Sequence, residues 1–488
     1  MADTDLCDTN ELRTVFSKAM SRMYQDEVPL YSDLLDIVTE VNGEVLGKSG
    51  LDYQHETDID IARITLERHG AIRLGTPTEL ATIRRLFAQL GMFPVGYYDL
   101  SIAGLPMHAT AFRPLAGEAL RRNPFRIFTT LLRPELLSEE PRRLAQEILS
   151  SRNIFPAKLM ELLGDAERRG GVLKSQVDDF IRESLSIFRW QKVAVATYEK
   201  YLELKAEHPI LADVVSFPTS HINHLTPRTL DIDLAQDAMQ SRGMQAKERI
   251  EGPPRRKFQI LLRQTSFKAL NEQVDFPASS SGHDMVRGVH SARFGEIEQR
   301  GWALTKEGRA LYDRLIVETS KSFAAASSQS QTYDEILEHV FKQFPDDVDA
   351  LQKQGLVFCR YKLTKKWALS QWAGSKDVSS LPYLVSKGLV TFQPITYEDF
   401  LPFSAAGIFQ SNLGTSGSNT DIVSGTPDQE QFEKCLGQKT ADPMELYQEM
   451  ESQSISDIWL EMEKSRPAET EAPLSIAHQV PGISISIR

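Results

Sequence analysis

The sequence predicts an α+β protein, in which short strands are separated by helical segments of very unequal length. Stretches rich in β-branched and aromatic residues, typical of strands, lie at 70–75, 107–114, 256–267 and 292–305. Apolar residues make up 41% of the 488 residues and charged residues 25%, which is typical of a globular protein with a sizeable core. Because the strands are irregularly spaced, a regular alternation of strand and helix is not expected.

The overall charge and the cysteine content exclude several classes of protein. The formal net charge is −12, whereas a nucleic-acid-binding protein usually presents a basic face. The three cysteines, Cys7, Cys359 and Cys435, lie far apart and form no metal-binding or disulfide pattern, which favours a reducing compartment. No signal peptide and no long apolar stretch is apparent, so we expect a cytoplasmic protein with small-molecule partners, no nucleic acid and no membrane.

Several segments have the pattern of amphipathic helices. Residues 8–24 and 77–90 repeat apolar side chains at helical spacing, and Thr76 with Glu79 can form a capping box at the start of the second. Another helix is expected to begin at Thr332, which also has a glutamate three residues later.

The chain is expected to form one catalytic domain followed by a tail. The domain spans 1–414, with large helical insertions at 115–205 and 305–345. Residues 415–488 are predicted to be a linker and a partly disordered tail, because they begin with a Gly- and Ser-rich stretch and end with few core-forming residues. A short helix is expected within this tail at 443–464.

The stretch ERHGAIRLGT contains the first candidate site residues, His69 and Arg73. The two are four residues apart, so on a strand their side chains share one face. An imidazole can bind a metal, and a guanidinium can hold a carboxylate through two parallel hydrogen bonds. A surface histidine beside a surface arginine would look the same from this segment alone.

The stretch SHINHLTPRTLDID contains His221 and His224, which are three residues apart. Pro218 and Pro227 bracket the pair, and the intervening residues favour a strand over a helix. On a strand, residues three apart point to opposite faces, so the two histidines are not expected to bind the same metal. One of them can be a ligand while the other is structural.

The stretch RFGEIEQRGWALT places Glu296 and Glu298 on one face of a predicted strand. They could form a general acid/base pair, one could bind a metal, or both could be solvated. His283 and His290 lie shortly before this strand and are competing metal ligands.

Two histidines and one carboxylate from different strands would form a facial triad. In iron(II) oxygenases this arrangement leaves three coordination positions open for substrate and dioxygen. Zinc enzymes use the same residue types with a water molecule in the open position. The residues alone do not distinguish the two metals.

The chain resembles the 2-oxoadipate dioxygenase/decarboxylase family, a branch of the vicinal-oxygen-chelate superfamily. The resemblance runs from about residue 10 to about residue 415 and rests on several motifs in one order. These motifs are RHGAIR, SFPTSHINHLTPR, RFGEIEQRG and YEDFLPFSAAGIFQSNLG. The resemblance implies a curved β-sheet or partial barrel around a metal, with large helical insertions.

The resemblance also implies the roles of individual residues. His69, His224 and Glu296 match the metal ligands of the family, and Arg73 matches its substrate-carboxylate arginine. The segment LPFSAAGIF borders the substrate in the family, which points to Phe403 and Ser404. A smaller aliphatic residue is typical where this chain has Phe403.

Three further residues are candidates for a supporting role beside the metal ligands. They are His221, Glu298 and His290. The implied cofactor is Fe(II), and the implied reaction converts 2-oxoadipate and dioxygen into (R)-2-hydroxyglutarate and carbon dioxide in lysine catabolism. The alternative is a zinc-dependent hydrolase or lyase on a similar barrel.

Overall fold

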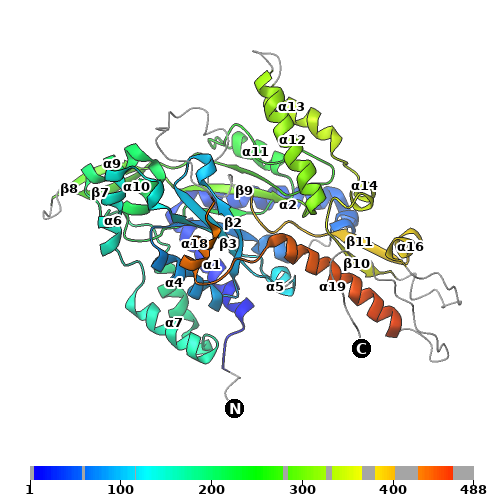
Figure 1. The fold of residues 1–488 in the computed structure, drawn as a ribbon, viewed down its shortest axis with the longest axis horizontal. Helices are drawn as coiled ribbons and strands as arrows, with labels where there is room; N and C mark the ends of the chain where they lie inside the picture. The colour runs from blue at the N-terminus through cyan, green and yellow to red at the C-terminus, as the bar shows by residue number, and fades with distance from the viewer. Residues whose placement is uncertain are drawn as a thin grey trace.

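The structure is a computed structural model that describes residues 5–57, 61–115, 117–278, 284–325, 332–364, 380–401 and 427–464. A curled sheet of seven strands lies at its centre, with helices around it (Figure 1). The strand order is β2-β3-β4-β1-β5-β9-β6. The α+β class and the curved sheet predicted from the sequence are confirmed.

The sheet mixes parallel and antiparallel pairs. Its strands are β1 (Arg68–Leu74), β2 (Phe93–Asp99), β3 (Met107–Arg113), β4 (Arg126–Leu132), β5 (His224–Pro227), β6 (Leu262–Ser266) and β9 (Phe294–Arg300). β1 runs parallel to β4 and antiparallel to β5, while β5 runs parallel to β9. Strands from distant parts of the sequence therefore meet at the middle of the sheet.

Both faces of the sheet are buried by apolar side chains. One core, which includes Ala71, Ala109, Ala111 and Phe128, fills the concave face. The other, which includes Ile72, Ile127 and Leu225, packs under the helices on the convex face. Because neighbouring residues of β1 belong to opposite cores, each strand directs alternate side chains to the concave side.

Most helices cover the sheet. Those of the first half are α1 (Thr9–Glu27), α2 (Pro29–Thr57), α3 (Ile61–Leu66), α4 (Pro77–Gln89), α5 (Gly117–Arg122), α6 (Glu139–Ser151), α7 (Ala157–Arg169), α8 (Val177–Ser186), α9 (Tyr198–Glu207), α10 (Pro209–Ser216) and α11 (Ile232–Ser241). The expected capping box of Thr76 and Glu79 is present at α4. None of the described helices is long and apolar enough to cross a membrane.

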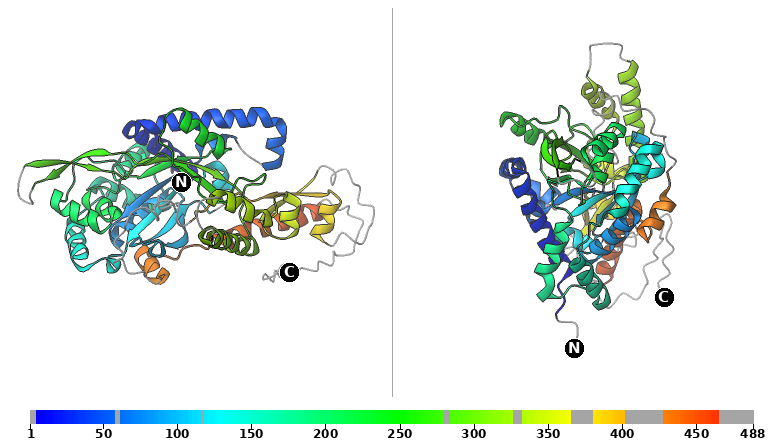
Figure 2. Two further views of the ribbon diagram at one scale, coloured as in Figure 1. Left: turned by 90° about the horizontal axis from the view of Figure 1, so that it is seen from above. Right: turned by 90° about the vertical axis from the view of Figure 1, so that its left-hand side faces the viewer.

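The second half adds two small sheets and further helices. A two-stranded hairpin of β7 (Glu272–Pro277) and β8 (Met285–His290) projects at one end of the molecule, and β10 (Cys359–Leu363) pairs with β11 (Val390–Pro394) at the other (Figure 2). The helices are α12 (Lys306–Ala325), α13 (Tyr333–Val340), α14 (Val348–Lys353), α16 (Leu381–Ser386), α18 (Gln429–Leu436) and α19 (Pro443–Lys464). The predicted helix start at Thr332 is confirmed by its capping box with Glu335.

The linker expected from residue 415 lies largely outside the described residues, whereas the tail expected after it needs a correction within 427–464. α18 packs against α4 and α19 against β10, and Tyr447 of α19 is buried against the rings of Phe358 and Tyr397. The predicted helix at 443–464 is confirmed, but it belongs to the folded body. The prediction treated it as part of a tail because the preceding Gly- and Ser-rich stretch separates it from the main sequence pattern.

Two other sequence predictions were wrong in part. The stretch 115–205 contains β4, whose residues RIFTTLL are buried on both faces and show no polar alternation. The predicted strand at 256–267 begins only at Leu262, since Leu261 adopts a left-handed backbone with φ of 55°. Strand prediction from alternation fails where both faces are buried.

Candidate metal centre and substrate site

Three adjacent strands bring His69, His224 and Glu296 together on the concave face of the sheet. One ligand atom from each lies within 4.8 Å of the others, and all three side chains are buried. His69 Nε2 lies 3.1 Å and His224 Nε2 4.0 Å from Glu296 Oε1. We call these three residues the metal group.

The register of the strands places the metal group. In β1 and β5, Ala71 pairs with His224 and His69 with Thr226, so the two histidines lie diagonally across one ladder. In β5 and β9, His224 pairs with Phe294, two residues before Glu296. Gly70 permits the close approach of this segment, because a Cβ there would lie 2.6 Å from Ile222 Cδ1.

The donor atoms of the metal group suit a metal ion. Both ring nitrogens of His224 and the Oε2 atom of Glu296 are buried without a hydrogen-bond partner among the described residues. Burying such atoms unpaired is costly, and a bound cation would satisfy them. Burial, with His69 and Arg73 nearby, holds the pKa of His224 well below its ordinary value, so its imidazole is neutral and can coordinate.

Glu296 and Glu298 occupy the same face of β9 but have different partners. Glu296 Oε1 accepts hydrogen bonds from the neutral Thr226 hydroxyl at 3.1 Å and the Gln264 amide at 2.5 Å. Glu298 is paired with the guanidinium of Arg300 through two contacts of 2.8 Å. Glu296 therefore retains a free oxygen for a metal, whereas Glu298 is already neutralised.

Glu298 also contacts the ring of His69 from behind. Its Oε2 atom lies 2.8 Å from His69 Nδ1, while Nε2 of the same ring faces Glu296. Burial opposes ionisation of Glu298, but Arg300 and His69 outweigh it and lower the pKa of this carboxyl to about 2. An ionised carboxylate on Nδ1 fixes the tautomer that leaves Nε2 free to coordinate.

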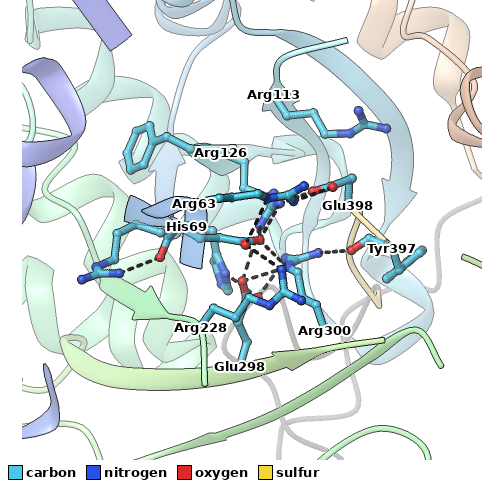
Figure 3. Close-up of polar contacts among 12 residues, drawn as sticks. Arg63, His69, Arg113, Arg126, Arg228, Glu298, Arg300, Tyr397 and Glu398 are labelled. Atoms are coloured by element: carbon cyan, nitrogen blue, oxygen red, sulfur yellow. Dashed lines mark hydrogen bonds and ion pairs between the residues drawn. The ribbon is translucent and has the colours of Figure 1, made fainter. Parts of the chain in front are cut away.

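A buried network of arginines and glutamates surrounds this contact (Figure 3). Its members are Arg63, Arg126, Arg228, Arg300, Glu67, Glu298 and Glu398. Arg126 contacts Glu67, Glu298 and Glu398, and so joins three of its acidic members. The network holds Glu298 in place, because this carboxylate contacts Arg126 and Arg300 as well as His69.

The same network holds a segment that covers His69. Arg300 donates to the carbonyl oxygens of Tyr397 at 2.9 Å and Asp399 at 3.0 Å. The ring of Phe400 packs edge-on against His69, with the ring centroids 4.9 Å apart. Apolar contact at this place limits the access of water to the ligand ring.

Arg73 lies on the same face of β1 as His69, with Ala71 between them. Its Nη1 atom donates to Asp213 Oδ2 at 2.6 Å, and its side chain is 11% exposed. Among the described residues, no hydrogen bond uses Nε or Nη2 of Arg73. The free edge has the two-donor geometry that matches a carboxylate.

Asp213 belongs to a second cluster of potential ligands with His221 and His290. Its Oδ1 atom lies 3.1 Å from His221 Nε2 and 2.8 Å from His290 Nε2. We call these three residues the clamp group, because Asp213 also holds Arg73. His221 and His224 thus face different clusters, and His290 lies with His221.

Three candidate residues lie outside the described part of the chain. They are His283, Phe403 and Ser404. Their expected roles remain predictions.

Sequence reasoning missed several residues that the structure brings to the site. Asp213 is a single acidic residue within the apolar helix α10, and Gln264 and Arg126 lie in strands that are buried on both faces. The available signal was a charged or amide side chain in an apolar helix or a buried strand, since buried polar groups need partners.

Comparison with known proteins identifies the family. The family model described as 2-oxoadipate dioxygenase/decarboxylase matches residues 16–412. A relative from Shigella flexneri with that name is 48% identical over 447 residues, which cover 91% of this chain and 97% of the relative. The chain belongs to the 2-oxoadipate dioxygenase/decarboxylase family. A member from Pseudomonas putida is 46% identical and covers 93% of this chain and 97% of its own length.

A solved structure agrees with this assignment to the 2-oxoadipate dioxygenase/decarboxylase family. The hydroxyglutarate synthase of Pseudomonas putida, solved in complex with 2-oxoadipate, has a TM-score of 0.83 and 44% identity. The match covers 94% of this chain and 100% of that chain. The resemblance deduced from the sequence motifs is confirmed.

Proposed function

We propose that this protein is an Fe(II)-dependent dioxygenase that converts 2-oxoadipate and dioxygen into (R)-2-hydroxyglutarate and carbon dioxide. Family membership and the name of the related structure support this activity. The observation that carries it is the metal group on the same concave face as Arg73. We also propose that the protein acts in the cytoplasm and in lysine degradation.

The metal group would hold the iron. His69, His224 and Glu296 offer two imidazole nitrogen atoms and one carboxylate oxygen, the donor set typical of iron(II) oxygenases. When bound, the iron supplies the redox chemistry by which dioxygen is activated and the 2-oxo acid is decarboxylated. Glu298 keeps the ring of His69 in the coordinating orientation, and Phe400 limits the access of water to it.

The spacing along β1 accounts for a dicarboxylic substrate. Residues four apart on a strand are about 13 Å apart. Ala71, which lies between His69 and Arg73 on the same face of β1, has a small side chain. The 2-oxo acid end can lie at the metal group while the distal carboxylate binds the free edge of Arg73. Holding both ends fixes which carbon is oxidised.

Phe403 and Ser404 are proposed to border the same substrate. In the sequence they come shortly after Tyr397 and Asp399, whose carbonyl oxygens accept hydrogen bonds from Arg300. A bulky Phe403 in place of a smaller aliphatic residue predicts a tighter limit on the length of the substrate chain.

The test is oxygen uptake by the protein reconstituted anaerobically with Fe(II), across 2-oxo acids of different length. We expect 2-oxoadipate to be preferred, with one carbon dioxide and one (R)-2-hydroxyglutarate per dioxygen. With ¹⁸O₂, one labelled atom should enter the new carboxylate and one the hydroxyl group. Turnover that is sustained by zinc without dioxygen would instead favour the hydrolase or lyase alternative.

A further inference from the structure

We propose that Asp213, held by His290 and Tyr201, is the positioning residue that sets the orientation of Arg73 and thereby the selectivity for a distal carboxylate. The inference rests on the proposed function, in which Arg73 binds that carboxylate. It assigns a role to a buried cluster that contacts none of the residues of the metal group.

The clamp group has the residue types of a metal site, but its contacts suit a different role. The guanidinium of Arg73 already places a permanent cation 2.6 Å from the carboxylate of Asp213. The other nitrogen of the His290 ring, Nδ1, lies 3.1 Å from the Tyr201 hydroxyl. Both nitrogens of His221 lack a hydrogen-bond partner among the described residues, so the match to a role in holding Arg73 rests on the cation already in place and on the two engaged nitrogens of His290.

Four groups fix the carboxylate of Asp213 in one orientation. Oδ2 accepts from Arg73 Nη1 at 2.6 Å and from the Asn223 amide at 3.2 Å, while Oδ1 faces both histidines. Burial opposes its ionisation, but His221 and Arg73 outweigh this and hold the pKa of Asp213 well below its ordinary value. The carboxylate is therefore charged and has no freedom to turn away from Arg73.

The histidine rings are fixed in turn by aromatic side chains. Trp190 packs edge-on against His221 and parallel to His290, with ring centroids 4.6 Å and 5.9 Å apart. An ionised carboxylate only accepts hydrogen bonds, so the proton of His290 lies on Nε2 and Nδ1 faces the hydroxyl of Tyr201. The same hydroxyl also lies 3.1 Å from the carbonyl oxygen of Val289, beside His290 in the chain. The order of support therefore runs from Tyr201 through His290 to Asp213 and Arg73.

Residues 220–223 connect the clamp group to the metal group. The Ser220 hydroxyl donates to the Arg73 carbonyl at 2.9 Å, and the Asn223 backbone amide donates to Ala71 at 2.9 Å. Asn223 precedes the proposed ligand His224 and also binds Asp213. Arg73 is thus held at a fixed position relative to the metal group, which a substrate bound at both ends requires.

Asp213 has two opposing effects on a bound carboxylate. Its negative charge weakens the attraction of Arg73 for an anion, while its hydrogen bond directs the free Nε–Nη2 edge toward the substrate. We assign the larger effect to orientation, because a flexible arginine side chain loses much of its rotamer freedom when it binds. Removal of Asp213 should then reduce selectivity for the dicarboxylate.

The test compares 2-oxoadipate with 2-oxohexanoate, which carries a methyl group in place of the distal carboxylate. Selectivity is the ratio of the two kcat/KM values, and anaerobic calorimetry of each acid on the iron-loaded protein gives a second readout. We expect Asp213→Asn to lower the selectivity about 10–100-fold, through KM for 2-oxoadipate, as outer-shell substitutions commonly do. Turnover of 2-oxohexanoate should change little.

Three further variants separate the possible causes. Arg73→Met should abolish the selectivity; if it does not, the proposed role of Arg73 is wrong. Tyr201→Phe, a smaller change, should lower the selectivity about 2–5-fold with an unchanged fold. Asp233→Asn is the matched control, because Asp233 also holds a strand arginine, Arg263, from a helix, and it should leave the selectivity unchanged.

The inference would be overturned by a folded Asp213→Asn protein that keeps the wild-type selectivity while Arg73→Met loses it. It would also be overturned if Asp213→Asn bound 2-oxoadipate more tightly, since charge and not orientation would then dominate. If Asp213→Asn does not fold, Tyr201→Phe decides the question in the same assay.

Discussion

The metal group and the clamp group contain the same types of side chain but differ in their partners. Each combines two buried histidines with one buried carboxylate. In the metal group, both nitrogens of His224 and one oxygen of Glu296 have no hydrogen-bond partner among the described residues. In the clamp group, both oxygens of Asp213 and both nitrogens of His290 are engaged. Both nitrogens of His221 also lack a hydrogen-bond partner among the described residues, so neither residue type nor an unpaired nitrogen alone identifies a metal site. The two groups differ in that the carboxylate of the clamp group already pairs with the cation of Arg73, whereas Glu296 keeps an unpaired oxygen.

The largest expected difference in activity is between substitutions of His224 and of His221, which are three residues apart in the sequence. His224→Ala should lower kcat/KM for 2-oxoadipate by on the order of 10³-fold or more, because a metal ion contributes several kcal/mol to catalysis. His221→Ala should keep its iron and lose less than about 10-fold. Steady-state oxygen uptake checks both. Equal losses in the two variants would contradict the separation of the groups.

In the absence of metal, a substitution in the clamp group should destabilise the protein more than a substitution in the metal group, which is the reverse of the order expected for activity. His290→Phe removes one hydrogen-bond partner from each of two groups, the Asp213 carboxylate and the Tyr201 hydroxyl, and should lower the free energy of unfolding by about 2–3 kcal/mol. His224→Phe removes nitrogens that have no partner, so it should change the free energy by no more than about 1.5 kcal/mol. Urea unfolding of the chelator-treated proteins measures both. A larger loss in His224→Phe would mean that its nitrogens are paired without metal.

If Glu298 holds the ring of His69 in its coordinating orientation, loss of the Glu298 charge should weaken the binding of the metal ion. Glu298→Gln removes the charge behind the ligand ring and should weaken metal binding about 10–100-fold. Glu272→Gln is the matched control, because Glu272 also holds a buried arginine, Arg293, through two contacts. Competition with a chelator measures the affinity of each variant. An equal loss in both would indicate a general effect of broken ion pairs.

The smallest expected effect concerns the hydroxyl group on Glu296. Thr226→Val removes one neutral hydrogen bond from the ligand carboxylate and should weaken metal binding about 5-fold, equivalent to about 1 kcal/mol. Thr110→Val removes a buried hydroxyl that donates to Gly96 and should leave metal affinity unchanged. If Thr226→Val also has no effect, the hydroxyl does not orient Glu296.

Residues that share one strand could be placed from the sequence. Alternation along β1 puts His69 and Arg73 on one face, and alternation along β9 does the same for Glu296 and Glu298. His221 and His224 lie in two clusters, as expected, but β5 begins only at His224, so the alternation of one strand is not what separates them. Their roles as ligands and supporting residues remain predictions.

Features that depend on distant pairing could not be predicted from the residues alone. β1 pairs with β5 although more than 150 residues separate the two strands in the sequence. No local sequence pattern predicts which of their residues lie opposite each other. Asp213 was not predicted as a site residue, because α10 has the composition of an ordinary buried helix and only the structure shows which residues contact Asp213. β4 was assigned to a helical region because a strand buried on both faces lacks polar alternation.

The most direct test of the account is the number of iron ions bound per chain after anaerobic reconstitution. Elemental analysis should find one ion in the wild-type protein, one in Asp213→Asn and His290→Phe, and almost none in His224→Ala and Glu296→Ala. Two ions in the wild-type protein, with one lost on substitution of Asp213, would contradict the assignment of the clamp group. Iron retained by Glu296→Ala would contradict the assignment of the metal group.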